Sequence, residues 1–263
     1  EQDYALTFIG EAQNLNFERV ESYGDYDGNR KQAGGHLRFD YGVGFTLVGL
    51  DYERAEMTNA GTKDSYDMRG LFAEQLLEFS TGTSVTGGIR RDDHATYGTH
   101  NTYQVGLAQE ITDSMVIKAN YATGFRAPSN YELYGSFGAG NKNLKPETSR
   151  SYDLGVAGQV AGHVSYQLRG YHNNITDRIG YNSNTFQYQQ VKGDSKVWGA
   201  EASVKASMGA YSISQTDNYA YGTEPTSATN SNRRAIAGVP RHSGKTTATY
   251  QGENFMMQAT SLF

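Results

Sequence analysis

Apolar and polar residues alternate along most of the chain with a period of two, which is the period of a β-strand with two different faces. Within residues 115–121, Ile117 and Tyr121 fall on one face and Lys118 falls on the other. Residues 164–169 repeat the pattern, with three apolar side chains on one face and three polar side chains on the other. The alternation predicts an all-β chain whose sheet has one apolar face and one polar face.

The alternating runs predict about thirteen strands, each of which reaches or exceeds the nine to eleven residues that cross a bilayer when tilted. The predicted strands cover residues 4–19, 31–41, 45–57, 66–79, 83–93, 101–111, 114–124, 148–158, 163–174, 196–206, 210–220, 241–250 and 254–263.

The predicted connections between these strands alternate in length. Short turns fall near residues 42–44, 80–82, 112–113, 161–162, 208–209 and 252–253. Long connections fall near residues 20–30, 58–65, 94–100, 125–147, 175–195 and 221–240. This alternation is typical of an antiparallel up-and-down transmembrane β-barrel, with short periplasmic turns and long extracellular loops. A soluble β-sandwich also has short strands and turns, but it does not make every second connection long.

The composition supports a barrel wall. Only 37% of the residues are hydrophobic, yet the chain has 20 Tyr and 31 Gly, which suits strands with one apolar and one polar face. A disordered chain would lack the aromatic residues. No apolar run is long enough for a membrane helix. The net charge of -5 and the lack of a basic stripe predict no nucleic-acid partner. The sequence contains no nucleophile triad or phosphate loop that would indicate an enzyme.

One segment carries a family resemblance. Residues 124–135 read GFRAPSNYELYG and residues 141–149 read NKNLKPETS, and together they resemble TonB-dependent receptors, in which a strand ends in a Gly-Phe-Arg/Lys-Ala-Pro turn. Residues 91–98, 171–179 and 199–202 also resemble strands of that family. The resemblance covers the chain from about Asp40 to its end and looks closest to the cobalamin (vitamin B12) receptor subgroup. Siderophore and haem receptors share much of the pattern.

The resemblance implies an outer-membrane protein of a Gram-negative bacterium that contacts membrane lipid. It further implies a receptor that imports a bulky scarce nutrient, a corrinoid or a ferric chelate such as an iron siderophore. The energy would come from the TonB complex through a plug domain, without chemistry on the ligand. Barrels of this family have about 22 strands. We therefore expect residues 1–263 to form one β-barrel domain fragment of about 13 strands, without the plug domain and the last strands. A passive porin-like barrel or an adhesin barrel is the alternative, and a surface enzyme would need a Ser/His or Asp/His pair.

The longest loop lies between Pro128 and Pro146, and by the resemblance it faces the extracellular side, where ligand is met. The candidate ligand-binding residues in it are Tyr131, Tyr134, Phe137, Asn141 and Asn143. Its aromatic side chains suit a large planar ligand. The alternative is that they pack the loop against the barrel rim or form an interfacial aromatic girdle.

The residues that flank this loop have predicted structural roles. Pro128 cannot donate a hydrogen bond to a strand ladder, so it ends the strand before it. Arg126 and Glu147 stand at the two ends of the loop, and their charges predict a salt bridge that holds the loop in place. Lumen-facing charges such as Lys118, Arg169 and Glu201 are expected to contact water or the plug.

Two groups of side chains are candidate metal ligands. Asp25, Asp27 and Asn29 place oxygen ligands at alternate positions, as calcium loops do, although His36 stands where a helical calcium loop needs a Glu. A solvated turn is the alternative to a calcium site there. Asp92, Asp93, His94 and His100 gather at one strand end without the fixed ligand spacing of a zinc or iron site.

Overall fold

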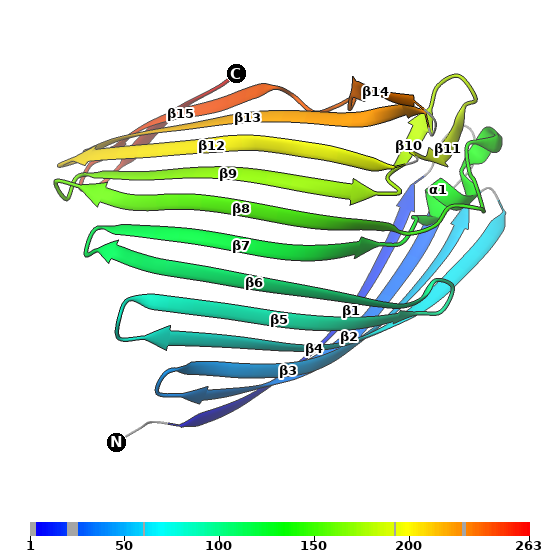
Figure 1. Cartoon of the computed structure of the whole chain (residues 1–263), viewed down its shortest axis with the longest axis horizontal. Coiled ribbons are helices and arrows are strands. Elements are labelled where there is room, and N and C mark those ends of the chain that lie inside the picture. Colours follow the sequence, from blue (N-terminus) through cyan, green and yellow to red (C-terminus); the bar gives the residue numbers. More distant parts are fainter. Residues whose placement is uncertain (1–3, 20–25, 60, 192, 228–229) are drawn as a thin grey trace.

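A single large antiparallel sheet makes up most of the protein (Figure 1). The computed structural model describes residues 4–19, 26–59, 61–191, 193–227 and 230–263. The sheet has fourteen strands, and thirteen of them follow one another in the order of the chain. The fourteenth, β14, branches from β13, and β10 and β11 form a separate two-stranded sheet.

The strands are β1 (Ala5–Arg19), β2 (Tyr26–Tyr41), β3 (Gly44–Asn59), β4 (Thr62–Phe79), β5 (Thr83–His94), β6 (Gly98–Thr112), β7 (Met115–Arg126), β8 (Glu147–Val160), β9 (Val164–Thr176), β10 (Ile179–Asn182), β11 (Gln187–Gln190), β12 (Asp194–Met208), β13 (Tyr211–Ser227), β14 (Asn230–Ala235), β15 (His242–Gln251) and β16 (Met256–Leu262). One short helix, α1 (Asn130–Tyr134), and a 3-10 turn (Ser136–Gly138) lie between β7 and β8. No helix within these described ranges is long and apolar enough to span a membrane.

The predicted all-β up-and-down architecture is confirmed, with each predicted strand found in its place. Several predicted long connections are wrong in length, because the strands extend further toward that end of the sheet than their apolar alternation does. Residues 58–65 are mostly strand, since β3 ends at Asn59 and β4 begins at Thr62. Residues 221–240 likewise include the end of β13 and all of β14. These strand ends are polar on both faces and therefore look like loops in the sequence.

The register of the sheet separates two faces. Ile117 pairs with Val156, and Val156 pairs with Leu168, so these three side chains lie on one face. Leu154 stands two residues before Val156 in the same strand and therefore lies on that face too. Following the pairs across the sheet gives one apolar face, here called the outward face. Its large exposed side chains include Leu50, Leu71, Ile89, Val105, Ile117, Leu154, Leu168, Trp198, Val204 and Ile213.

The opposite, inward face is polar. It carries Asp51, Glu53, Arg90, Asp92, Lys118, Asn120, Asp153, Arg169, Glu201 and Lys205. Lys118 and Glu201 therefore face inward and Tyr121 and Trp198 face outward, as the alternation predicts. Arg169 forms salt bridges to Asp153 at 3.4 Å and to Glu201 at 3.3 Å, so the inward charges pair with one another across strands.

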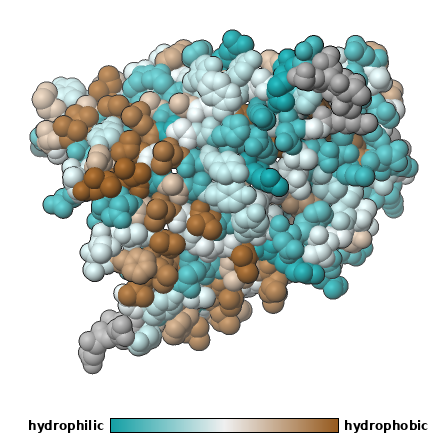
Figure 2. Space-filling view, in the orientation of Figure 1, coloured by the Kyte–Doolittle hydropathy of each residue, from teal (hydrophilic) through white to brown (hydrophobic). Residues whose placement is uncertain are grey.

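Apolar side chains are exposed rather than gathered in a core. Among the described residues the buried hydrophobic side chains are only Ala55, Leu144, Ile179, Val191 and Ala220. Figure 2 shows apolar side chains over the side of the sheet near the short turns and polar ones over the other side, where α1, β10 and β14 lie. The sheet curves strongly, and no pairing joins β1 to β16 within the described part of the chain. Such a surface fits a hydrocarbon environment better than water.

Candidate functional site

The connections with the most structure lie at one end of the sheet, here called the long-loop end (Figure 1). The longest of them, residues 127–146, joins β7 to β8. As predicted, Pro128 ends the strand before it, since β7 stops at Arg126. The side chain of Ser129 accepts a hydrogen bond from the backbone N–H of Glu132, and the Glu132 carboxylate accepts one from the backbone N–H of Ser129 at 2.7 Å. This reciprocal cap starts α1 immediately after the strand.

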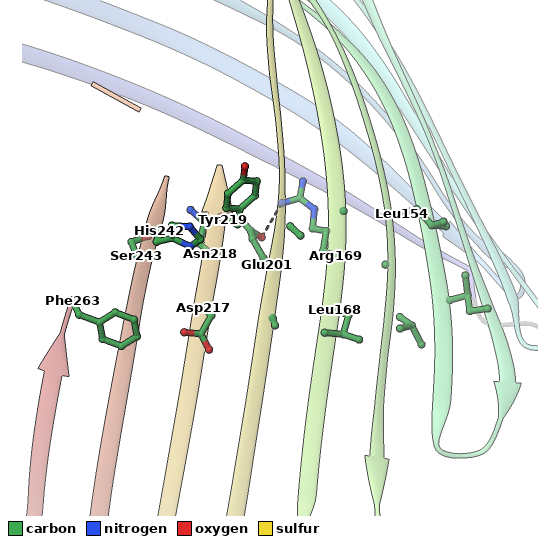
Figure 3. Close-up of a pocket in the computed structure, with 16 residues that line it drawn as sticks. Leu154, Leu168, Arg169, Glu201, Asp217, Asn218, Tyr219, His242, Ser243 and Phe263 are labelled. Atoms are coloured by element: carbon green, nitrogen blue, oxygen red, sulfur yellow. Dashed lines mark hydrogen bonds and ion pairs between the residues drawn. The ribbon is translucent and has the colours of Figure 1, made fainter. Parts of the chain in front are cut away.

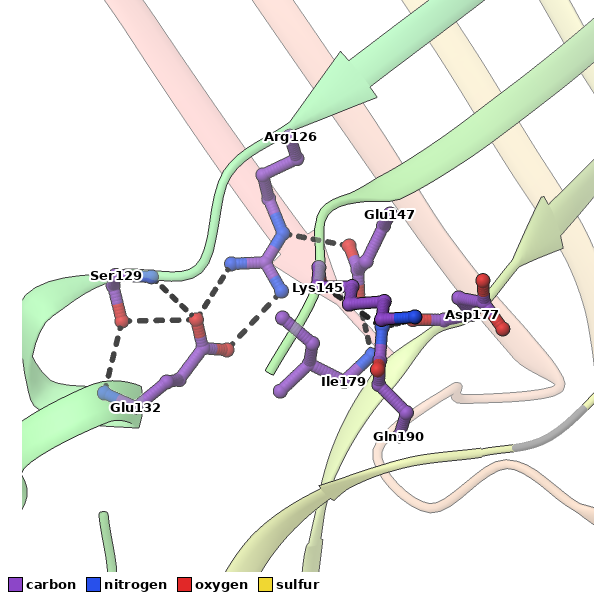
Figure 4. A network of polar contacts seen from close by, with 8 residues as sticks. All are labelled: Arg126, Ser129, Glu132, Lys145, Glu147, Asp177, Ile179 and Gln190. Atoms are coloured by element: carbon purple, nitrogen blue, oxygen red, sulfur yellow. Dashed lines mark hydrogen bonds and ion pairs between the residues drawn. The ribbon is translucent and has the colours of Figure 1, made fainter. Parts of the chain in front are cut away.

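Arg126 connects both ends of this loop (Figure 4). Its Nε donates to Glu147 Oε2 at 2.6 Å, which confirms the predicted salt bridge across the loop. Its Nη1 and Nη2 donate to the two oxygens of Glu132 at 2.9 and 3.1 Å. The other oxygen of Glu147 accepts a hydrogen bond from the backbone N–H of Ile179 in β10. One guanidinium and two carboxylates thus hold the strand end, α1 and the next loop together.

The charge state of Glu132 follows from these contacts. Burial by itself raises the pKa of a carboxyl group, and the hydrogen bonds from Arg126 and Ser129 act in the opposite direction. The hydrogen bonds prevail, and the pKa of Glu132 lies below its ordinary value. Glu132 is therefore ionised at neutral pH and keeps its bidentate contact with Arg126.

The β10–β11 hairpin packs against the same loop. The backbone N–H of Tyr188 donates to the carbonyl oxygen of Ala139 at 2.8 Å, and Asn141 Nδ2 donates to the carbonyl oxygen of Tyr188 at 3.0 Å. Gln187 Nε2 reaches the carbonyl oxygen of Gly140 at 3.1 Å. The buried apolar side chains of this region are Leu144, Ile179 and Val191. The two loops therefore form one ordered cap, here called the rim cap (residues 127–146 and 177–191).

The predicted ligand-binding residues all lie in the rim cap, in two different situations. Phe137 is 82% exposed and Tyr131 is 45% exposed, so both rings are open to a ligand. The ring of Tyr131 meets Tyr188 edge-on with centroids 6.1 Å apart, and Tyr188 in turn meets Tyr181. A row of aromatic rings thus crosses from the loop to the hairpin.

Tyr134, Asn141 and Asn143 have structural contacts. Lys142 Nζ lies 5.0 Å from the centre of the Tyr134 ring, and burial raises the pKa of the Tyr134 hydroxyl. Asn141 accepts a hydrogen bond from the backbone N–H of Asn143 at 3.0 Å while it donates to the hairpin. Asn141 therefore links the two loops of the rim cap, and Asn143 is exposed beside it.

Sequence reasoning missed a polar cluster on the inward face of β2–β5. Glu53 is only 4% exposed and accepts hydrogen bonds from Arg30 at 2.5 Å, Gln32 at 2.7 Å and Tyr66 at 2.8 Å. These residues stand up to 36 positions apart in the sequence and meet only because three strands pair in register. No motif or spacing within one strand could have revealed them.

A second inward cluster surrounds Arg90. Its Nη1 and Nη2 donate to the two oxygens of Asp51 at 2.7 and 2.9 Å, and its Nε donates to Asp92 at 2.8 Å. The same face holds a hollow of about 280 Å³ whose lining includes Glu74, Arg90 and Gln104 beside Phe72. The inward face thus offers paired charges and hydrogen-bonding groups below the rim cap.

The predicted metal ligands are only partly described. Asp25 lies outside the described residues. Asn29 Nδ2 donates to Asn14 Oδ1 at 2.8 Å and also to Asn16. His94 is buried between the rings of Tyr66 and Tyr97. In the parts of the chain that the structure describes, no group of three or more His, Asp or Glu side chains is arranged to hold a metal ion.

Comparison with known families shows which family the chain belongs to. The sequence profile of the family described as TonB dependent receptor-like, beta-barrel matches residues 2–262. The chain belongs to this family. The family resemblance carried by residues 124–149 is thereby confirmed, and it extends over nearly the whole chain.

Several solved structures have a similar fold over nearly the whole of this chain. The siderophore receptor PirA from Pseudomonas aeruginosa is similar with a TM-score of 0.74 and 18% identity over 98% of this chain and 54% of that one. The copper transporter OprC has a TM-score of 0.75 and 17% identity over 98% of this chain and 48% of its own. The ferric enterobactin receptor PfeA from Pseudomonas aeruginosa, in complex with enterobactin, has a TM-score of 0.70 and 17% identity over 99% of this chain and 47% of its own.

The chain spans about half the length of these proteins. At identities of 17–18% these structures establish the fold, and the cobalamin subgroup stays a prediction.

Proposed function

We propose that this chain forms the wall and part of the extracellular rim of an outer-membrane receptor that imports a bulky, scarce nutrient with energy delivered through the TonB complex. The rim cap carries the proposal: a rigid, charge-pinned loop and hairpin present Tyr131 and Phe137 outward at one end of the sheet. A rigid platform with exposed aromatic rings binds a large planar ligand at little cost in conformational entropy.

We further propose a ferric chelate as the ligand class. Structures similar to this chain include a siderophore receptor and a ferric-catecholate import receptor, which supports this class over a corrinoid. The family match also favours a TonB-coupled receptor over a passive porin-like or adhesin barrel. A calcium ion at Asp25, Asp27 and Asn29, and coupling through a plug domain, remain predictions within the same proposal.

Ligand binding to the full-length receptor in detergent tests the proposal. Ferric enterobactin is expected to bind saturably, and Tyr131→Ala together with Phe137→Ala is expected to weaken binding by about tenfold or more, since stacking on an aromatic ring contributes about 1 kcal/mol each. Phe255→Ala is the matched control, because Phe255 is 56% exposed in the last short turn, at the opposite end of the sheet.

The outcomes separate the ligand classes. Binding of cyanocobalamin in place of ferric enterobactin would assign the corrinoid class. Absence of both, in a protein that still shows a barrel circular-dichroism spectrum, contradicts the ferric-chelate proposal. Equal loss in the Phe255→Ala control would exclude the rim cap as the binding surface.

A further inference from the structure

Within the described strands, basic side chains on the outward face occur only toward the long-loop end. The outward-facing basic residues are Lys31, Arg54, Lys63, Arg69, Arg91, Arg150, Lys196 and Arg233. In the half of each described strand that lies near the short turns, every Lys or Arg faces inward, as Arg38, Lys118 and Lys205 do. The outward face is therefore cationic at one side of the apolar belt and not at the other.

Two of these basic residues, Arg150 and Lys196, lie in one row across neighbouring strands. Arg150 pairs with Asn174, and Asn174 pairs with Lys196. Since neighbouring strands are about 4.8 Å apart, the backbones of Arg150 and Lys196 are about 10 Å apart. Both side chains are exposed, and neither has a salt bridge within the described residues, whereas Arg54 is already paired with Glu56 and Asp67.

The next row toward the apolar belt is aromatic. Tyr121, Tyr152, His172, Trp198 and Tyr221 pair successively across five strands and all face outward. The rings of Tyr121 and Tyr152 are 4.9 Å apart, and those of Trp198 and Tyr221 are 5.8 Å apart. A row of Tyr and Trp with apolar side chains on one side marks the boundary between hydrocarbon and headgroups. Arg150 and Lys196 therefore stand at headgroup level.

A groove of about 610 Å³ opens below this aromatic row, on the strands that carry Arg150 and Lys196 (Figure 3). The floor of the groove carries only small side chains, because Gly170, Ala200 and Ala202 face outward there. Leu154 and Leu168 form one wall. The other wall includes Asp217, whose carboxylate accepts a hydrogen bond from Gln215 at 2.9 Å. An acyl chain therefore fits along the leucine wall, away from the carboxylate.

We propose that this surface binds a phosphorylated membrane lipid of the leaflet at the long-loop end. Its phosphate groups contact Arg150 and Lys196, its upper part lies beside the aromatic row, and one acyl chain occupies the groove. The four residue steps from Arg150 to Leu154, and from Lys196 to Ala200, span about 13 Å along the strand, so the basic pair lies at headgroup level when the groove lies among the upper acyl chains. Charge complementarity and the adjoining apolar groove together favour a lipid over a free anion. This lipid site is independent of nutrient import.

The test uses the full-length protein in detergent micelles and bisphosphorylated lipid A as the probe, with bound lipid counted by native mass spectrometry. The double variant Arg150→Gln, Lys196→Gln is expected to bind lipid A about 25-fold more weakly, since each basic residue near an anionic headgroup contributes about fivefold. Lys118→Gln, Lys205→Gln is the matched control, because it removes the same charge from the inward face of β7 and β12. The control is expected to bind like the unaltered protein.

A second variant tests the groove without touching the charges. Ala200→Leu adds bulk to the groove floor on the lipid-exposed face, where folding tolerates it, and is expected to weaken lipid A binding severalfold. Unchanged binding in the double Gln variant overturns the proposal, as does equal loss in the inward control. Competition by inorganic phosphate at concentrations equal to lipid A also overturns it, because that result assigns a simple anion site. A protein that binds lipid A but does not bind the nutrient would contradict the proposed function and leave the lipid site unaffected.

Discussion

At the scale of single residues, Arg126 determines whether the rim cap is rigid. Glu132 and Glu147, its two partners, have side chains only 14% and 12% exposed, while Arg126 itself is 46% exposed. Arg126→Gln leaves two largely buried carboxylates without their cation. Because the guanidinium is partly solvated, we expect a local cost of about 1–2 kcal/mol, below that of breaking a fully buried pair.

Hydrogen exchange of residues 127–146 measures this cost, and protection in the variant is expected to fall by about tenfold. Arg54→Gln serves as the control, since both carboxylates that pair with Arg54 are exposed and the pair should contribute nothing measurable. Unchanged exchange in the Arg126 variant would show that backbone hydrogen bonds alone hold the rim cap.

The same carboxylates predict how the rim cap responds to pH. The pKa of Glu132 is lower in the folded loop than its ordinary value of 4.5. A group with a lowered folded pKa contributes stability above its unfolded pKa and loses that contribution as the pH falls through the folded value. We therefore expect exchange of α1, corrected for the intrinsic rate, to rise below about pH 4.5. Arg126→Gln should remove this pH dependence, and a rise that persists in the variant would assign the effect to another group.

At the scale of elements, the turns at the short-turn end depend on particular backbone angles. Gly44 begins β3 with φ at 147°, and a Cβ there would collide with the carbonyl oxygen of Leu76 in β4. Gly209 has φ at 56°, and a Cβ there would meet nothing within 4 Å. Gly44→Ala is therefore expected to destabilise the protein by about 3 kcal/mol, and Gly209→Ala by about 1 kcal/mol. Urea unfolding in lipid vesicles measures both, and equal effects would contradict the steric argument.

The elements also show what sequence patterns can and cannot reveal. Strands were predictable wherever one face meets lipid, as for Ile117 and Tyr121 in β7, because lipid imposes strict alternation. The ends of β4 and β13 carry polar side chains on both faces, so no alternation marks them. β10 and β11 are four residues each, too short for a periodic signal. The Arg126–Glu147 pair was predictable from its position, whereas the contacts around Glu53 depend on strand register.

At the scale of the whole molecule, the sheet is stable only if its outward face meets hydrocarbon and its inward face does not. Leu168 and Gln167 are neighbours in β9 that test this division, because Leu168 faces outward and is 50% exposed, while Gln167 faces inward. A Lys on the outward face, within the apolar belt, either loses its hydration or extends its side chain to the membrane–water interface. Placing it there lowers the free energy of unfolding by about 2–4 kcal/mol. A Lys on the inward face joins a polar surface that already carries Lys118 and Lys205.

We therefore expect Leu168→Lys to lower the free energy of unfolding in lipid vesicles by about 2–4 kcal/mol and Gln167→Lys to change it by less than about 1 kcal/mol. The two variants introduce the same side chain one residue apart, so strand propensity and net charge are matched. In detergent, where water reaches the outward face more readily, the difference between them should shrink. Equal stability of the two variants in vesicles would mean that hydrocarbon does not contact the outward face at Leu168, which would contradict the membrane-facing orientation on which the lipid site also depends.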